Sequence, residues 1–336
     1  DSRTSVARIL GCRAQEIIFT SGGTESNNMA ILGLFEKYKK QFIPHIITSA
    51  IEHPAVLEVC REVERRGGKV SYVKVDENGL INPKDVFSLI TSQTILVSVM
   101  LANNEIGTIE PIANISRAIK KYREEKNTVL PYFHTDACQA INYISANINS
   151  LGVDLMTLDG GKIYGPKGTG LLFVKRGIDL SPIIFGGGQE IGLRPGTENV
   201  SGIVGITKAL FCADRDQESE SKRLMPLRDY FISKALQISP KITLNGDVKN
   251  RLPNNINICI LGIDSEFAVI GFDLKGVACS AGSSCNVLKE ISSSYVIESL
   301  NKKECAGSSL RFTLGRHTNK SDINKALMIL SKIVAQ

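Results

Sequence analysis

The chain has 336 residues, of which 43% are hydrophobic and 22% charged, the balance of a globular protein with a sizeable core and room for two domains. Its apolar runs are too short to cross a membrane, and its net charge of +6 is spread along the chain without a nucleic-acid-binding motif. Composition therefore argues against a membrane protein and gives no support for a direct nucleic-acid partner.

The cysteines indicate free thiols in a reducing compartment. The chain has 8 of them, with no CxxC pair and no regular framework that would indicate disulfides or structural zinc. Cys12, Cys60, Cys212 and Cys259 lie in apolar patterns, so we expect them in the core. We predict a cytoplasmic protein without a metal site. Because the chain begins at Asp1 and not at methionine, we interpret it as a fragment, and a lost targeting segment stays open.

The first strand and turn form a candidate anion site. Residues 16–20 predict a strand, 21–24 a Gly-Gly turn, and 25–40 an amphipathic helix with basic residues in its last turn. The amides of Gly23 and Thr24 at the start of this helix lack helical partners and, with the helix dipole, suit an anion. A plain strand–helix connection is the alternative explanation.

The next elements place polar residues at strand ends. Residues 45–50 predict a strand, and His53 follows it just before a helix at 55–66. The strand at 94–101 likewise runs into Asn104. In an open α/β sheet, ligands bind beyond the carboxyl ends of the strands, so both residues are candidate ligand contacts. A structural hydrogen bond or a loop cap is the alternative for each.

Two further strands carry an acid and a lysine. The strand at 129–136 ends in Asp136, with Gln139 one helical turn beyond, and the strand at 153–159 leads into Lys162 in a glycine-rich loop. For a lone lysine a salt-bridged loop residue is the simpler interpretation, but we expect that Lys162 is not a solvated surface charge. A lysine that forms an imine, a carboxylate that pairs with a ring nitrogen, and a helix N-terminus that holds phosphate together indicate a pyridoxal phosphate site.

The order of the elements predicts two domains. Alternating strands and helices through residue 210 predict a largely parallel, doubly wound sheet. The glycine-rich stretch 183–200 is too long for a simple turn and marks a functional loop or an interface. A charged helix near 214–224 leads on to more helices and strands. We therefore predict an α/β fold with a large domain at 1–217 and a smaller α+β domain at 218–336.

A series of short motifs resembles the NifS/IscS-type cysteine desulfurases, class V aminotransferase relatives of pyridoxal phosphate fold-type I. In chain order the motifs are TSGGTESNN, IEHPAV, NNEIGTIEPI, HTDACQA, GKIYGPKG, GGGQEIGLRPGT, GSSC and SLRFTLGR. The resemblance covers nearly the whole chain, and the motifs are specific in this order and spacing. It implies a mainly parallel seven-stranded sheet in the large domain, a homodimer, and the family's long active-site loop, because a polar stretch follows GSSC.

The resemblance implies a role for each residue that would contact the ring of pyridoxal 5'-phosphate. Lys162 would bond covalently to the cofactor and serve as general base in catalysis. Asp136 would pair with the ring nitrogen, and His53 would stack on the ring. Gln139 and Asn104 would contact the ring hydroxyl and the substrate.

The remaining implied roles concern phosphate, substrate and sulfur. Gly23 and Thr24 would hold the phosphate, and Thr197 would reach the phosphate of the neighbouring subunit. Arg311 would bind the carboxylate of L-cysteine, and Cys285 would take its sulfur as a persulfide, leaving L-alanine. The sulfur would then pass to an acceptor protein, either an iron–sulfur cluster scaffold or a tRNA-thiolating enzyme.

The chain departs from the family's pattern at several places. Asp159 and Gly161 replace the serine and histidine that normally hold phosphate beside the lysine, and an aspartate there repels phosphate unless it turns away or stays protonated. Ile191 replaces the usual arginine, and segments that the family has before Asp1 and after Gln336 are not in this sequence. Two alternatives therefore stay open: a selenocysteine lyase or other pyridoxal phosphate β-lyase, and a non-catalytic paralogue that binds a partner.

Overall fold

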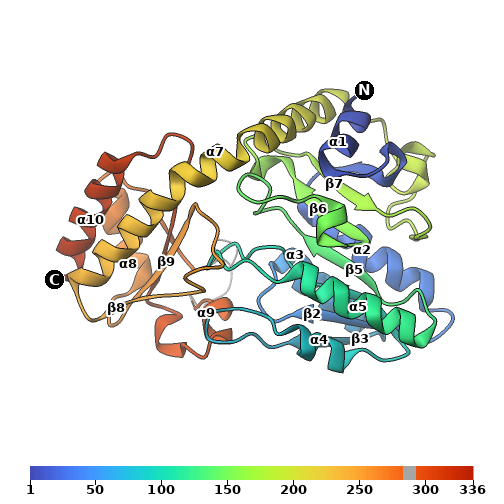
Figure 1. Cartoon of the computed structure of the whole chain (residues 1–336), viewed down its shortest axis with the longest axis horizontal. Helices are drawn as coiled ribbons and strands as arrows, with labels where there is room; N and C mark the ends of the chain where they lie inside the picture. Colours follow the sequence, from blue (N-terminus) through green and yellow to red (C-terminus); the bar gives the residue numbers. More distant parts are fainter. Residues whose placement is uncertain (283–292, 336) are drawn as a thin grey trace. The chain divides into compact units, whose positions relative to one another are not determined.

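The computed structural model describes residues 1–282 and 293–335. The chain forms two compact units, which are described one at a time (Figure 1). The first contains Asp1–Lys74, Ile81–Ala102 and Glu110–Gln217, and the second contains Val75–Leu80, Asn103–Ile109 and Glu218–Gln336. Two short segments thus belong to the second unit although their neighbours in the sequence belong to the first.

The first unit is built on a seven-stranded sheet in the order β1-β7-β6-β5-β4-β2-β3. The strands are Ile17–Thr20 (β1), His45–Ser49 (β2), Lys69–Val73 (β3), Thr94–Ser98 (β4), Tyr132–Asp136 (β5), Leu155–Asp159 (β6) and Gly170–Val174 (β7). Strands β2 to β6 run parallel, while β7 pairs antiparallel with both β6 and β1. The predicted mainly parallel seven-stranded sheet is confirmed.

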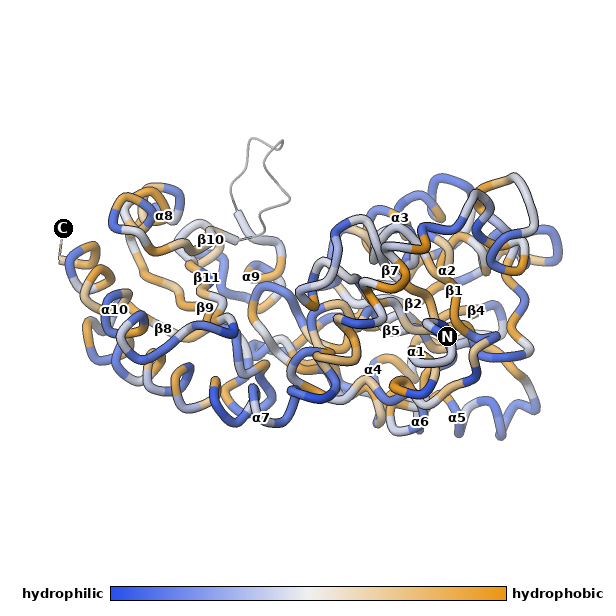
Figure 2. The backbone as a smooth tube through the Cα atoms, turned by 90° about the horizontal axis from the view of Figure 1, so that it is seen from above, coloured by the Kyte–Doolittle hydropathy of each residue, from blue (hydrophilic) through white to orange (hydrophobic). Residues whose placement is uncertain are grey.

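Helices cover both faces of this sheet because its central strands are hydrophobic and buried (Figure 2). They are Ser2–Leu10 (α1), Gly23–Tyr38 (α2), Pro54–Arg65 (α3), Pro83–Leu89 (α4), Ile112–Lys126 (α5), Ile148–Leu151 (α6) and the first part of Val200–Ile238 (α7), with 3-10 turns at Ala14–Glu16, Gly160–Lys162 and Gln189–Gly192. Helices α2 and α3 pack together on one face, and α5 packs with α4 and α6 on the other (Figure 1). The main core, which includes Phe35, Ile46 and Leu96, lies where α2 and α3 meet the sheet.

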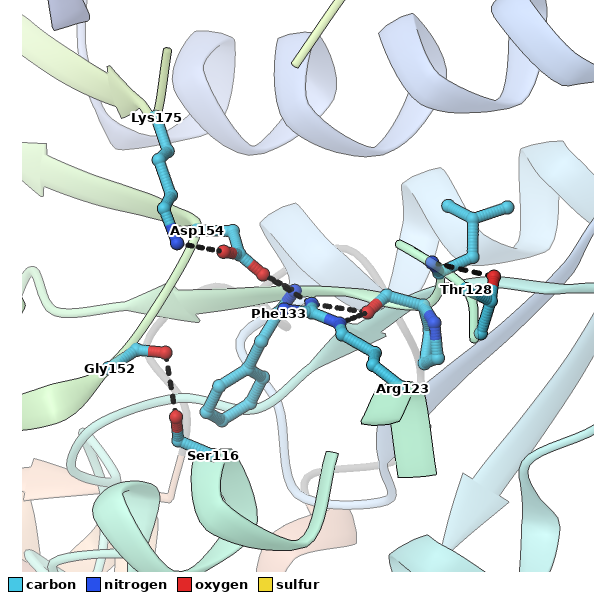
Figure 3. Close-up of polar contacts among 9 residues, drawn as sticks. Ser116, Arg123, Thr128, Phe133, Gly152, Asp154 and Lys175 are labelled. Atoms are coloured by element: carbon cyan, nitrogen blue, oxygen red, sulfur yellow. Dashed lines mark hydrogen bonds and ion pairs between the residues drawn. The ribbon is translucent and has the colours of Figure 1, made fainter. Parts of the chain in front are cut away.

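One buried carboxylate fixes the amino-terminal ends of the central strands. Asp154, just ahead of β6, accepts a hydrogen bond from the backbone N of Phe133 at 3.0 Å and from Lys175 Nζ at 3.1 Å, and it pairs with Arg123 of α5 (Figure 3). These contacts tie α5 to β5, β6 and the end of β7. Strand β5 then runs to Asp136 at its opposite end.

The second unit contains a four-stranded antiparallel sheet in the order β10-β11-β9-β8. Its elements are Ile242–Leu244 (β8), Asn255–Ile260 (β9), Ser280–Ala281 (β10), Ser309–Thr313 (β11), Ser265–Asp273 (α8), Tyr295–Ser299 (α9), Lys320–Val334 (α10), a 3-10 turn at Lys303–Cys305 and the last part of α7. The rings of Phe231 and Phe272 lie 5.0 and 5.1 Å from the ring of Phe312, centroid to centroid. This aromatic cluster joins α7 and α8 to the sheet.

The prediction of free thiols is wrong for one pair of cysteines. Cys259 and Cys305 form a disulfide with their Cα atoms 5.3 Å apart. They are 46 residues apart in the sequence, and pairing of β9 with β11, which sets Cys259 opposite Ser309, brings them together. Sequence spacing could not show this, because the contact depends on strand pairing. Among the described residues no cluster of His, Cys, Asp and Glu suits a metal ion, and no helix is both long and apolar enough to cross a membrane.

Candidate active site

Three of the predicted site residues lie at or just after the carboxyl ends of parallel strands of the first unit. Asp136 ends β5, Lys162 ends the 3-10 turn that follows β6, and His53 lies between β2 and α3. Because β2, β4, β5 and β6 are parallel, their carboxyl ends share one edge of the sheet, where ligands bind in open α/β folds. The sequence thus predicts correctly which strand ends carry these three residues.

The carboxylate of Asp136 is held in one orientation. It is 7% exposed, and its Oδ2 accepts a hydrogen bond from Asn27 Nδ2 at 2.7 Å while its Oδ1 accepts one from Cys138 N at 2.9 Å. Asn27, which is fully buried on α2, is a site residue that no sequence motif indicates. A polar residue on the buried face of a helix needs a partner, but the sequence alone does not show that this partner is Asp136. Gln139 lies in the turn after β5, three residues beyond Asp136.

The imidazole of His53 is positioned as the N-cap of α3. Its Nδ1 accepts a hydrogen bond from the backbone N of Ala55 at 3.1 Å, which leaves the ring proton on Nε2. Burial lowers the pKa of His53, and nearby Lys162 lowers it further, while Asp136 and Asp159 oppose that shift. The ring is therefore neutral at pH 7, and its pKa is sensitive to all three charged residues of the site.

A second buried carboxyl group adjoins His53. Glu52 is fully buried and accepts hydrogen bonds from Ser49 Oγ at 2.7 Å and from Met100 N at 2.8 Å. Burial, with a smaller contribution from Asp136, raises the pKa of Glu52 to about 8. Glu52 is thus mainly protonated at pH 7, so it adds little negative charge beside Asp136.

The loop at Lys162 differs from the expectation in one respect. Lys162 is exposed in the single chain, so the prediction that it is not solvated is wrong for this chain alone. The turn before it contains Gly160 and Gly161, which have no side chains to cover the lysine. The backbone carbonyl of Lys162 accepts a hydrogen bond from Asn142 Nδ2 at 2.8 Å, which fixes the backbone at the end of the turn.

The start of α2 contacts that same loop. Gly23 begins α2, and its N–H donates to Asp159 Oδ2 at 2.9 Å, while Asp159 Oδ1 accepts from Gly161 N at 2.7 Å. A Cβ at Gly23 would lie 2.8 Å from the sulfur of Cys138, so the close approach requires glycine here. Thr24, the next residue of α2, is exposed.

The second unit brings together the predicted substrate-binding pair. Arg311 of β11 donates through Nη1 to the backbone carbonyl of Asn104 at 2.8 Å. The adjacent Glu105 is fully buried, accepts from Ser294 Oγ at 2.6 Å, and has its pKa raised by burial although Arg311 acts in the opposite direction. Asn257 Nδ2 donates to the carbonyl of Glu105 at 3.1 Å. These contacts fix the segment at 103–109 within this unit.

Comparisons with known proteins identify the family. The model of the aminotransferase class-V family matches residues 1–326. This chain belongs to the aminotransferase class-V family.

Individual members of the class-V family resemble this chain over nearly its whole length. Cysteine desulfurase IscS of Dictyoglomus turgidum is 44% identical over 335 residues, which cover 99% of this chain and 83% of that protein. The probable mitochondrial cysteine desulfurase of Dictyostelium discoideum is 40% identical and covers 99% of this chain and 72% of its own length. The crystal structure of a NifS-like protein from Rickettsia africae has a TM-score of 0.86 and 30% identity, covering 100% of this chain and 87% of that one. The predicted fold-type I class and the family resemblance are confirmed.

Thr197 and Ile191 belong to the glycine-rich stretch 183–200 of the first unit. Thr197 is exposed in the glycine-rich loop, in which Glu190 accepts from Phe19 N at 2.9 Å and pairs with Arg3. Ile191, at the position of the family's usual arginine, is 71% exposed and has a φ of 56°, which is unusual for a β-branched residue. Cys285, the predicted nucleophile, lies outside the described residues.

Proposed function

We propose that this chain is a pyridoxal 5'-phosphate-dependent L-cysteine desulfurase. The observation that carries the proposal is the grouping of Asp136, His53 and Lys162 in one unit, in which the pKa of His53 responds to both of the others. The names of the similar class-V proteins support the same activity. Selenocysteine lyase and other β-lyase activities stay alternatives on the same fold.

The ring end of this site, formed by Asp136 and His53, suits the pyridine ring. Asp136 is an acceptor in a fixed orientation and would keep a proton on the ring nitrogen, and the neutral imidazole of His53 offers a flat face. The exposed amine of Lys162 is accessible for a covalent bond. When bound, the cofactor supplies an electron sink for charge at the α-carbon of the substrate. The phosphate end fits less well, since the amide of Gly23 already donates to Asp159.

The other residues would handle the substrate and the sulfur. Lys162 would move a proton as general base, and Gln139 and Asn104 would orient ring and substrate. Arg311 would bind the substrate carboxylate, because a guanidinium pairs with it through two hydrogen bonds. Cys285 would attack the sulfur of L-cysteine, so that L-cysteine and the thiol become L-alanine and a Cys285 persulfide.

The sulfur acceptor, the location and the oligomeric state are part of the proposal. We take the acceptor to be an iron–sulfur cluster scaffold or a tRNA-thiolating enzyme, and the location to be the cytoplasm. A second copy of the chain would cover the exposed apolar residues around the glycine-rich loop, among them Phe185, which is 84% exposed, and Val200. Thr197 lies in this loop and would then reach the phosphate of the other subunit. Sedimentation of the wild type against Phe185→Asp tests this, since the variant should be monomeric.

The activity is tested by spectroscopy and by product analysis. Purified protein with added pyridoxal phosphate should show a yellow absorbance band that shifts when L-cysteine is added, and alanine should form. Cys285→Ser should abolish sulfur transfer; turnover that survives this change would indicate a β-lyase instead. The absence of such a band would favour the non-catalytic alternative. The hydrogen bond from Gly23 to Asp159 gives that alternative a physical basis, because it occupies an amide that is expected to hold phosphate.

A further inference from the structure

The carboxylate of Asp159 lies where the start of α2 offers its first amide. Its two oxygens accept from two different backbone N–H groups, Gly23 at 2.9 Å and Gly161 at 2.7 Å, although Gly23 and Asp159 are 136 residues apart in the sequence. Asp159 thereby links the loop after β6 to the N-terminus of a 16-residue helix. The positive end of a helix favours a nearby anion, so this position is electrostatically suited to the carboxylate.

The Gly23 amide is one of the two that the family resemblance assigns to phosphate, the other being that of Thr24. One N–H cannot donate at full strength to a carboxylate and to a phosphate at once, and two anions within hydrogen-bonding distance repel each other strongly in a partly buried site. The hydrogen bond from Gly23 to Asp159 and a hydrogen bond from Gly23 to phosphate are therefore mutually exclusive. Gly161 has no side chain to add a donor in compensation.

The start of α2 has little freedom to move away from Asp159. A Cβ placed on Gly170 of β7 would lie 2.6 Å from the backbone of Gly22, and one on Gly23 would lie 2.8 Å from Cys138 Sγ. The backbone of the turn before α2 is thus packed against β7 and against the segment after β5. If phosphate binds here, the side chain of Asp159 must leave, and the helix stays in place.

We infer that Asp159 is a built-in competitor for the phosphate of the cofactor. The inference deepens the proposed function and rests on it for the identity of the ligand. The site accordingly recognises the pyridine ring through Asp136 and His53. The phosphate adds less binding free energy than it would in a site where the Gly23 amide has no competing acceptor. Unphosphorylated pyridoxal, which has the same ring and no phosphate, separates the two contributions.

The test compares two ligands and four proteins by equilibrium titration. Dissociation constants for pyridoxal 5'-phosphate and for pyridoxal are measured on the wild type, Asp159→Ser, Asp159→Asn and Asp179→Ser. Serine and asparagine can still cap the 3-10 turn, so both variants should keep the loop folded. Asp179 is an exposed acid of the same unit that pairs with Lys37 in the last turn of α2, so Asp179→Ser removes an equal charge at the opposite end of that helix.

The expected result is selective. Asp159→Ser should tighten pyridoxal phosphate binding by about tenfold or more, because it removes a like charge beside the phosphate, and should change pyridoxal binding by less than about twofold. Asp159→Asn should also bind pyridoxal phosphate more tightly than the wild type does. Asp179→Ser should bind both ligands as tightly as the wild type.

Other outcomes overturn the inference. If Asp159→Ser leaves the phosphate ligand's affinity unchanged or weakens it, Asp159 does not compete. If Asp159→Ser tightens the binding of both ligands equally, the carboxylate of Asp159 acts on the loop and not on the phosphate. If pyridoxal binds the wild type but the variants show no selective gain, only this inference fails. If neither ligand binds any variant, the proposed function fails with it.

Discussion

The substitution Asp136→Asn tests the ring end of the site most directly. Asp136 is 7% exposed and sits at the end of β5, where Asn27 Nδ2 and Cys138 N donate to its two oxygens at 2.7 and 2.9 Å. Asparagine has the same shape but presents one acceptor and one donor group. If the new NH₂ faces Cys138 N, it meets a donor and that hydrogen bond is lost. If it faces Asn27, the hydrogen bond is kept only when the Asn27 amide turns over so that its Oδ1, which has no partner among the described residues, accepts.

The structure allows the size of both effects to be worked out. Replacing a buried charged acceptor by a neutral amide weakens or removes these hydrogen bonds, which should lower the free energy of unfolding by about 1–3 kcal/mol. The larger effect falls on turnover, because a neutral amide cannot keep the ring nitrogen protonated. Losing that ion pair in a shielded site should remove roughly 2–4 kcal/mol of transition-state stabilisation. At 1.36 kcal/mol per factor of ten, kcat should fall about thirty- to a thousandfold.

The assay measures alanine formed from L-cysteine at saturating cofactor, with far-UV circular dichroism as the check on folding. Asp154→Asn is the matched control, since it also replaces a buried carboxylate by its amide but at the opposite end of the central strands. It should lose stability and keep kcat within about twofold while folded. An Asp136→Asn protein that binds cofactor and turns over at nearly the wild-type rate would refute the role assigned to this residue.

Three further predictions follow from other parts of the first unit. Borohydride reduction of the protein with bound cofactor should label Lys162 in a peptide map, and a label on Lys167 instead would contradict the assignment. Urea unfolding is followed by circular dichroism, because the chain has no tryptophan. Asp154→Asn should lower the free energy of unfolding by about 3 kcal/mol, whereas Lys175→Met, which removes only an exposed partner, should lower it by less than about 1 kcal/mol. Equal losses would show that the contacts of Asp154 are not what stabilises the amino-terminal ends of the central strands. Burial lowers the pKa of His134 to about 4, below its unfolded value, so the unfolded state binds more protons between pH 6.5 and 4 and stability should fall by about 2 kcal/mol from pH 7 to 5. His134→Gln should reduce that pH dependence, and an unchanged dependence would assign it to other groups.

The strands of the large sheet are predictable because local chemistry decides them. Runs such as Thr94–Ser98 are short, apolar and rich in β-branched residues, and they are buried on both faces as such runs require. The segment at 103–109 follows one of these strands in the sequence but belongs to the second unit, held there by contacts to Asn255 and Asn257. Those contacts join residues about 150 positions apart, which no local pattern reveals. The functional division into domains at 1–217 and 218–336 stays a prediction.

In the candidate site, too, some residues are predictable from the sequence and others are not. Asp136, His53 and Lys162 are predictable because each follows a strand whose carboxyl end must lie at the ligand edge of a parallel sheet. Asn27 was not, because its role depends on which face of α2 meets β5. The exposure of Lys162 was also missed, because a strand end fixes the backbone position and not the cover above the side chain.

The two ends of the site differ in how their charge is controlled. At the ring end, burial raises the pKa of Glu52 to about 8, so Glu52 is mainly neutral at pH 7 and adds little negative charge beside Asp136. At the phosphate end, the change from serine and histidine to Asp159 and Gly161 removes two donors and adds an acceptor that takes the amide of Gly23. A sequence change confined to the loop after β6 thus weakens the preference for a phosphate at one end and leaves the hydrogen bonds to Asp136 intact. Because the contacts that orient Asp136 come from α2 and from the segment after β5, and not from that loop, affinity for the ring and affinity for the phosphate should vary independently in this chain.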